Sequence, residues 1–233
     1  MIKPGNRLLK IASMVGSCEK PADIGTDHAY IPIYLVQSGM CDTAVATDVN
    51  EGPLAKARRN IEKYRLSDRI DLRLGNGLEP IGDNECDVFI IAGMGGVVIA
   101  EILAASAEKA RKAKALVLQP AYYDEVLREF LLQNGFCIET EALVRDDGRI
   151  YTVIRAYYDG TVRSDEELYY HVGRALFVSR DPLLRDFLQR RIRIQAKIVN
   201  GMKKSAKIDE QAYMKEYRLL EKMKKAYDEC FAH

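Results

Sequence analysis

The feature that most constrains the fold is the segment of residues 21–28, Pro-Ala-Asp-Ile-Gly-Thr-Asp-His. A short apolar stretch, typical of a buried strand, ends in a carboxylate and a glycine. Polar residues follow, and then a run with helical periodicity begins. A parallel strand delivers its backbone in this way to a ligand at the carboxyl edge of a sheet. Gly25 lets the main chain turn sharply and pass close to that ligand. We therefore expect Asp23, Asp27 and His28 to project into one crevice.

The hydrophobic pattern of residues 1–160 predicts an α/β domain with a mostly parallel, seven-stranded sheet. Short buried or alternating runs are followed by helical periodicity, as parallel strands with crossover helices require. The turn Asp146-Asp147-Gly148 separates two β-rich runs that predict a terminal hairpin. The expected strands are 22–24, 43–49, 69–74, 87–92, 115–118, 137–145 and 149–158, and the expected helices are 7–15, 31–37, 52–64, 97–104 and 123–133.

Beyond residue 160 the pattern is helical, so we expect a second, smaller domain over residues 161–233. Two apolar stripes at helical spacing, separated by the polar stretch 201–210, predict an antiparallel helical hairpin of coiled-coil type. The first stripe comprises Leu184, Phe187, Ile194, Ile198 and Met202, and the second comprises Tyr213, Tyr217, Leu220, Tyr227 and Phe231.

The charge is unevenly distributed, although the net charge of the chain is only +1. From residue 180 onward, 14 Lys and Arg residues oppose 8 Asp and Glu residues, a net of +6, which leaves −5 on the first 179 residues. A basic tail is typical of proteins with a polyanionic partner. Any long exposed helix is also rich in Lys and Arg, so charge alone favours the two explanations equally.

The composition favours neither a membrane nor a metal. No apolar run approaches the ~20 residues of a membrane span. The first residues, Met-Ile-Lys-Pro-Gly-Asn-Arg, contain no hydrophobic signal region, so we expect a cytoplasmic protein. The five cysteines are scattered, without a Cys-x-x-Cys pair, and the three histidines are distant in sequence, which gives a zinc site little support. We expect a monomer or weak dimer without metal.

Polar and glycine residues close the expected strands in the order that a nucleoside-containing cofactor requires. Asp48 closes the second strand, where an acid can hold ribose hydroxyls. Asn76 and Gly77 follow the third strand, where an amide can pair with an adenine edge. Ala92 and Gly93 end the fourth strand, where chemistry usually takes place in such sheets.

The turn after the first strand favours a cofactor without phosphates. A dinucleotide site has Gly-x-Gly-x-x-Gly there, so that backbone amides reach the pyrophosphate. This turn has one glycine and additional acids, which repel a pyrophosphate. S-adenosylmethionine has no phosphate, and its ammonium and sulfonium charges would attract Asp23 and Asp27.

These motifs resemble those of class I S-adenosylmethionine-dependent methyltransferases, and specifically those of the bacterial tRNA adenine-22 N1-methyltransferase family. The resemblance covers nearly the whole chain, including the helical tail. Two departures are Asn76, where many methyltransferases have Asp, and Asp48, where Glu is common. The matching segments are Ala22-Asp-Ile-Gly-Thr-Asp-His-Ala-Tyr-Ile-Pro32, Asp48-Val-Asn-Glu-Gly-Pro53, Leu74-Gly-Asn-Gly-Leu78, Ile91-Ala-Gly-Met-Gly-Gly96 and Leu118-Gln-Pro120.

The resemblance implies a Rossmann-like fold and methyl transfer from S-adenosylmethionine to N1 of a tRNA adenine, at position 22. N1 of neutral adenine has a free lone pair, so the reaction needs alignment and exclusion of water rather than a base. Asp27 is our candidate carboxylate beside the cationic product, and His28 is a candidate for positioning the base or removing a proton. For His28, a cofactor-pocket role without chemistry is slightly favoured. The expected cofactor-binding residues are Asp23, Gly25, Thr26, His28, Asp48, Val49, Asn76, Gly77, Ala92 and Gly93.

Other functions stay open at this level. A methyltransferase acting on a small metabolite would not need the tail, and a cofactor-sensing RNA-binding protein would bind both ligands without turnover. A dehydrogenase is disfavoured, because Gly93-x-Gly-Gly96 follows the fourth strand and not the first. Tyr30, Tyr122 and Tyr123 are candidates for stacking on the target base, although tyrosines more often pack against a helix or core.

Overall fold

The computed structural model describes residues 2–204 and 209–231, which form two compact units that divide between Ser164 and Asp165. The sequence pattern places this boundary four residues earlier. The difference arises because Arg163 is bound to the first unit: its backbone N–H donates to the Leu132 carbonyl at 2.8 Å and its Nη1 donates to Asp159 Oδ1 at 2.9 Å.

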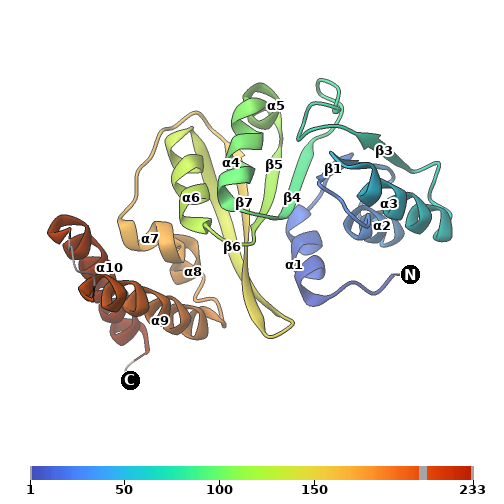
Figure 1. Ribbon diagram of the computed structural model, residues 1–233. Coiled ribbons are helices and arrows are strands. Elements are labelled where there is room, and N and C mark those ends of the chain that lie inside the picture. Colours follow the sequence, from blue (N-terminus) through green and yellow to red (C-terminus); the bar gives the residue numbers. More distant parts are fainter. Residues whose placement is uncertain (1, 205–208, 232–233) are drawn as a thin grey trace. The chain divides into compact units, whose positions relative to one another are not determined.

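The first unit is built on one seven-stranded sheet in the order β3-β2-β1-β4-β5-β7-β6 (Figure 1). The five strands from β3 to β5 are parallel, and the terminal hairpin joins β5 in antiparallel pairing through β7. The expected sheet is confirmed. The strands are β1 (Pro21–Ile24), β2 (Ala44–Asp48), β3 (Ile70–Leu74), β4 (Val88–Met94), β5 (Ala115–Pro120), β6 (Phe136–Asp146) and β7 (Arg149–Tyr158).

Helices cover both faces of this sheet, as buried parallel strands require. Side chains of α1, α2 and α3 form one hydrophobic cluster with one face, and side chains of α4, α5 and α6 form a second cluster with the other. The central strands are therefore buried on both sides. The helices are α1 (Asn6–Val15), α2 (Tyr30–Gln37), α3 (Glu51–Lys63), α4 (Gly96–Ala105), α5 (Ala107–Lys112) and α6 (Asp124–Gln133).

The structure corrects two details of the expected elements. Helix α5 has no counterpart in the sequence prediction, because six residues are too few to show a clear helical period. Strand β4 continues to Met94 instead of ending at Ala92. A register shift between Ala92 and Met94 allows this, and Gly93 takes a φ of +80° there, which a glycine adopts without strain.

Both ends of α1 are held by the hairpin of β6 and β7. At the start of the helix, the backbone N–H of Asn6 donates to Asp146 Oδ1 at 3.1 Å. At its end, Arg155 Nη1 donates to the carbonyls of Met14 and Val15 at 2.7 and 2.6 Å. Helix ends leave such backbone groups without partners inside the helix, and a cation is favoured at the carboxyl end. Side chains distant in sequence therefore complete this helix.

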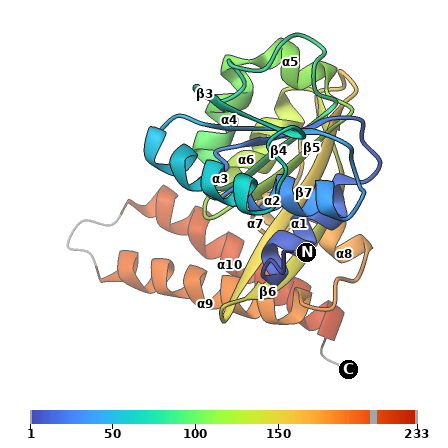
Figure 2. The same ribbon diagram turned by 90° about the vertical axis from the view of Figure 1, so that its right-hand side faces the viewer.

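The second unit is helical, and α9 and α10 run side by side as an antiparallel pair (Figure 2). Residues 205–208, within the expected polar separator, lie outside the described residues. No helix in the described part of the chain is long and apolar enough to cross a membrane. The helices of this unit are α7 (Glu167–Val172), α8 (Arg174–Val178), α9 (Leu184–Lys203) and α10 (Glu210–Phe231).

The contact between α9 and α10 differs from the expected apolar stripes. Ile194 and Ile198 are 42% and 43% exposed, whereas the neighbouring Gln195 and Val199 are buried. Gln195 belongs to the contact because its Nε2 donates to Glu216 Oε2 on α10 at 2.6 Å. A stripe defined by apolar residues alone misses a buried amide that is satisfied across the interface.

Candidate cofactor and substrate site

A cavity of about 690 Å³ lies at the carboxyl ends of β1, β2 and β4 and beside the segment that follows β3. The structure brings together in its walls every residue that the sequence singled out for cofactor or chemistry. These residues are Asp23, Gly25, Thr26, Asp27, His28, Asp48, Val49, Asn76, Gly77, Ala92 and Gly93.

The turn after β1 brings its backbone close to the ligand space of the cavity. Gly25 has a φ of +73°, and the backbone N–H groups of Gly25 and Thr26 both donate to the Thr47 carbonyl, at 2.8 and 2.9 Å. A Cβ at position 25 would lie 2.1 Å from Met94 Cε. Only a glycine at position 25 gives both this backbone conformation and room for the Met94 methyl group beside it.

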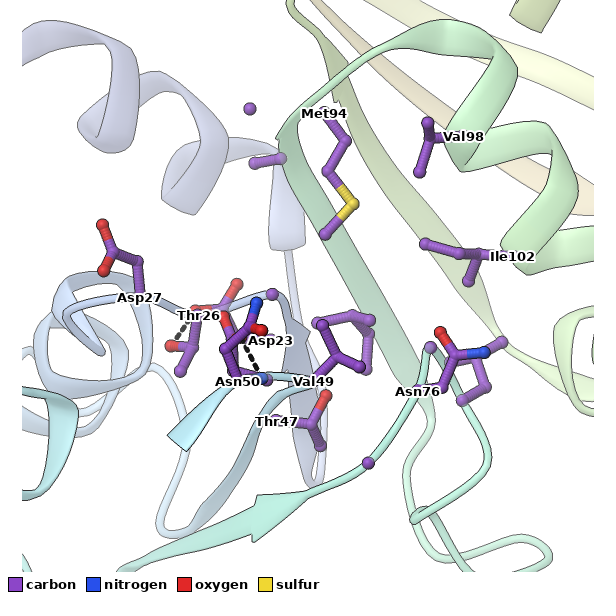
Figure 3. A pocket seen from close by; sticks show the side chains of 18 of the residues that line it. Asp23, Thr26, Asp27, Thr47, Val49, Asn50, Asn76, Met94, Val98 and Ile102 are labelled. Carbon is purple, nitrogen blue, oxygen red and sulfur yellow. Dashed lines mark hydrogen bonds between the residues drawn. The ribbon is translucent and has the colours of Figure 1, made fainter. Parts of the chain in front are cut away.

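Asp23 is a buried carboxyl group in the floor of the cavity. Its residue is 4% exposed, and its Oδ2 accepts a hydrogen bond from Thr26 Oγ1 at 2.6 Å (Figure 3). Burial raises the pKa of Asp23 to about 6; the Thr26 hydrogen bond opposes this rise, and the negative charge of Asp48 adds to it. A ligand cation beside Asp23 would relieve both unfavourable effects.

The end of β2 presents a second carboxylate and an unpaired hydroxyl. Asp48 is 8% exposed, and one of its oxygens, Oδ1, accepts from the Asn50 backbone N–H at 2.9 Å. The Thr47 side-chain oxygen is buried and has no hydrogen-bond partner among the described residues. Buried polar atoms are nearly always paired in native proteins. This wall of the cavity therefore has unused capacity for polar ligand groups.

Asp27 and His28 lie at the rim. The Asp27 carboxylate is 53% exposed and pairs with Lys56 Nζ and His28 Nε2, each at 3.4 Å. The His28 ring stacks on Tyr30, with centroids 5.1 Å apart. In Figure 3 the Asp27 carboxylate points away from Met94. Asp27 is thus oriented by a lysine and a histidine at the cavity entrance.

Sequence reasoning missed the apolar wall opposite β1. Met94, Val98 and Ile102 line the cavity from the end of β4 and from α4 (Figure 3). Val98 and Ile102 are four residues apart on α4, and this spacing was available as a signal, because residues i and i+4 share one face of a helix. Arg7, on α1, also lines the cavity, and nothing in its local sequence indicates that.

The candidate stacking tyrosines differ in position. Tyr30 lines the cavity, whereas Tyr122 and Tyr123 lie outside its walls and are 59% and 54% exposed. The Tyr122 ring packs on Gly95, where a Cβ would lie 2.6 Å from the ring carbon Cε2. The described residues contain no cluster of three or more His, Cys, Asp and Glu side chains able to hold a metal ion.

Comparison with known proteins agrees with this fold and site. A family model described as a methyltransferase domain matches residues 5–154. The tRNA (adenine(22)-N(1))-methyltransferase of Bacillus subtilis is 37% identical over 155 residues, 66% of this chain and 65% of that protein. The chain thus matches about two thirds of the length of this curated relative.

Solved structures match over almost their full length. Streptococcus pneumoniae Sp1610, a putative tRNA (m1A22) methyltransferase, aligns with a TM-score of 0.86 at 28% identity, covering 97% of this chain and 100% of that chain. Mycoplasma capricolum TrmK, solved with S-adenosyl-homocysteine, aligns with a TM-score of 0.80 at 30% identity, covering 95% and 96%. This chain belongs to the class I S-adenosylmethionine-dependent methyltransferases, in the family of the bacterial tRNA adenine-22 N1-methyltransferases. The expected family and its Rossmann-like fold are confirmed.

The residues of the cavity fit the cofactor of this family. The buried Asp23 and Asp48 suit an ammonium group and ribose hydroxyls, and the unpaired Thr47 hydroxyl offers a further polar contact. The turn at Gly25 passes close to the ligand space but provides no glycine-rich cradle for a pyrophosphate. A sulfonium cofactor without phosphates therefore suits the cavity better than a dinucleotide does.

Proposed function

We propose that this protein transfers a methyl group from S-adenosylmethionine to N1 of adenine 22 in tRNA. The observation that carries the proposal is the single cavity in which the buried Asp23 and Asp48, the Gly25 turn and the apolar wall from α4 meet. The family relationship supports the same reaction.

The chain's own residues would bind and orient the reactants. Asp23 would pair with the ammonium of the cofactor, Asp48 with the ribose hydroxyls, and Asn76 with the adenine edge. When bound, the cofactor supplies an electrophilic methyl group. Met94 and Val98, which line the apolar wall, would help to exclude water from the cavity.

No base is required to generate the nucleophile, because N1 of neutral adenine already carries a lone pair. The methylated base is cationic, and Asp27 at the rim is the carboxylate that would stabilise this charge. His28 would position the target base or the cofactor through its stack on Tyr30. N1 faces the partner base in a Watson–Crick pair, so the adenine must be unpaired or flipped out.

The second unit would hold the tRNA backbone. Arg190, Arg193, Lys203 and Lys204 are exposed on α9 and at its end, and phosphate contacts by such side chains give affinity without sequence reading. Arg191 is employed differently, since its Nε donates to the His171 carbonyl at 3.0 Å. A tRNA substrate would place the protein in the cytoplasm, and we propose a monomer or weak dimer.

The test is methyl transfer from labelled S-adenosylmethionine to unmodified tRNA, with the product mapped by mass spectrometry. We expect N1-methyladenosine at position 22, and none in a tRNA that carries guanine there. Asp48→Asn should reduce the rate, whereas Asp83→Asn, at an exposed acid outside the cavity, should not. Failure to methylate any tRNA would refute the proposal, and methylation of a small metabolite instead would favour that alternative function.

A further inference from the structure

Charge in the cavity is strongly one-sided. Among the described residues that line it, the acids are Asp23, Asp27, Asp48, Glu79 and Glu101. The single Lys or Arg side chain of the same lining is Arg7. An anionic ligand group is repelled by most of this cavity and attracted only near that guanidinium.

Arg7 is fixed in place by groups from two strands. Its Nη1 donates to Gln119 Oε1 at 2.6 Å, and Gln119 is completely buried in β5. The orientation of the Gln119 amide is set in turn, because its Nε2 donates to the Pro120 carbonyl at 2.7 Å. The guanidinium also lies over the Tyr151 ring of β7, 5.4 Å from its centroid.

This arrangement directs the guanidinium over the end of β4. A Cβ built on Gly93 would lie 3.7 Å from Arg7 Nη1 and within 4 Å of no other group outside its chain neighbours. Glycine at this position therefore leaves space for a ligand group beside the cation.

Most of the hydrogen-bonding capacity of Arg7 is unused. A guanidinium carries five N–H donors, and the hydrogen bond to Gln119 is the one that Arg7 makes within the described part of the chain. No carboxylate there lies within ion-pair distance of it. An arginine held only by a neutral amide and an aromatic face keeps its full charge available for a ligand.

We propose that Arg7 is the oxyanion-binding residue of this cavity. The inference rests on the proposed function, which supplies two ligands with suitable groups: the carboxylate at the amino acid end of the cofactor and a phosphate next to the target adenine. Both present two oxygens to a planar guanidinium, which binds such groups through paired, charge-assisted hydrogen bonds. Because acids line the rest of the cavity, Arg7 also determines which way round a zwitterionic ligand enters.

Calorimetry with S-adenosylmethionine and its decarboxylated analogue tests whether Arg7 binds the carboxylate of the cofactor. The two compounds differ only in the carboxylate, so the wild-type protein should prefer S-adenosylmethionine by about tenfold or more. Arg7→Gln should abolish this preference, and Arg7→Lys should keep part of it, because charge remains without the planar pair of donors. Arg59→Gln is the matched control: Arg59 is exposed on α3, outside the cavity, and should leave the preference unchanged.

Binding of tRNA in the presence of S-adenosyl-homocysteine tests whether Arg7 binds a phosphate next to the target adenine. If Arg7 binds phosphate, Arg7→Gln leaves the preference between the two methyl donors unchanged, weakens tRNA binding and lowers the salt-dependence slope by about one.

A folded Arg7→Gln protein that keeps both affinities overturns the proposal. If Arg7→Gln does not fold, two other results together overturn the proposal. The wild-type protein would bind both methyl donors equally, and the Arg7→Lys variant would bind tRNA with unchanged affinity. A carboxylate preference that depends on Arg7 in a protein that methylates no tRNA would refute the proposed function and leave this inference standing.

Discussion

At the scale of single residues, Asp23 combines a raised pKa with a position in the wall of the cavity. Its pKa in the folded protein is raised to about 6, while an unfolded chain has the ordinary value near 3.9. For an acid whose folded pKa is raised, the contribution to stability is fully present below the unfolded pKa and is lost as pH rises through the folded pKa. Between about pH 4 and pH 6, the ligand-free protein therefore loses stability at this residue.

Asp23→Asn should stabilise the ligand-free protein at neutral pH. A shift of about two pKa units corresponds to about 3 kcal/mol, so the free energy of unfolding at pH 7.5 should rise by up to that amount. The gain should disappear near pH 4, where Asp23 is already protonated. Urea denaturation at both pH values measures it, with Asp83→Asn as the exposed control. A gain of equal size at both pH values would contradict the assignment.

The affinity for the cofactor should also depend on the protonation state of Asp23. The ammonium of S-adenosylmethionine favours the ionised carboxylate, so the dissociation constant should rise as pH falls below about 6. In Asp23→Asn the affinity should be weaker at pH 7.5 and nearly independent of pH between 7.5 and 5. Calorimetric titrations at several pH values decide this, and an unchanged pH profile in the variant would assign the dependence to another group.

At the scale of elements, the turn between β4 and α4 is joined to the turn between β5 and α6. The Gly96 N–H donates to the Tyr122 carbonyl at 2.8 Å, and the Ala121 N–H donates to the Met94 carbonyl at 2.7 Å. A Cβ at position 96 would lie 2.0 Å from the Tyr123 carbonyl oxygen, which is backbone and cannot rotate away. The two turns thus form one rigid edge beside the cavity.

Gly96→Ala should consequently destabilise the fold by about 3 kcal/mol, at the upper end of overpacking costs. Gly52→Ala is the control, because no atom outside its chain neighbours and its own helix backbone lies within 4 Å of the added methyl group on α3. That control should be neutral or stabilising by up to about 1 kcal/mol. Urea denaturation compares the two variants, and equal stabilities would mean that the edge is not rigid.

The long elements were predictable, whereas the side-chain contacts between elements distant in sequence were not. Buried runs such as β5 contain enough apolar residues to define a strand within one or two positions. The site residues at strand ends follow from the same topology, because parallel strands end at a common edge. Arg7 could not be predicted, since its position depends on Gln119, more than one hundred residues away. Gln195 was missed because a polar residue in a helix contact has no hydrophobic signal.

At the scale of the whole molecule, we propose that the first unit binds the cofactor and that the second unit holds the tRNA backbone. Arg190→Glu combined with Arg193→Glu reverses two exposed charges of α9. If these residues bind phosphates, tRNA affinity should fall by at least about tenfold and the slope of log K against log salt should decrease by about two. Affinity for S-adenosyl-homocysteine should stay unchanged, because both residues lie outside the cavity. Loss of both affinities would indicate misfolding instead.

The hydrogen bonds between the β6–β7 hairpin and α1 have a consequence for when the cavity is completed during translation. Helix α1 leaves the ribosome before the other described elements, yet the side chains that hold its two ends, Asp146 and Arg155, belong to the last two strands of the sheet. Arg7 lies on this helix, so its side of the cavity stays incomplete until β6 and β7 have been translated. We therefore expect the nascent chain to complete this side of the cavity only after both strands of the hairpin have emerged.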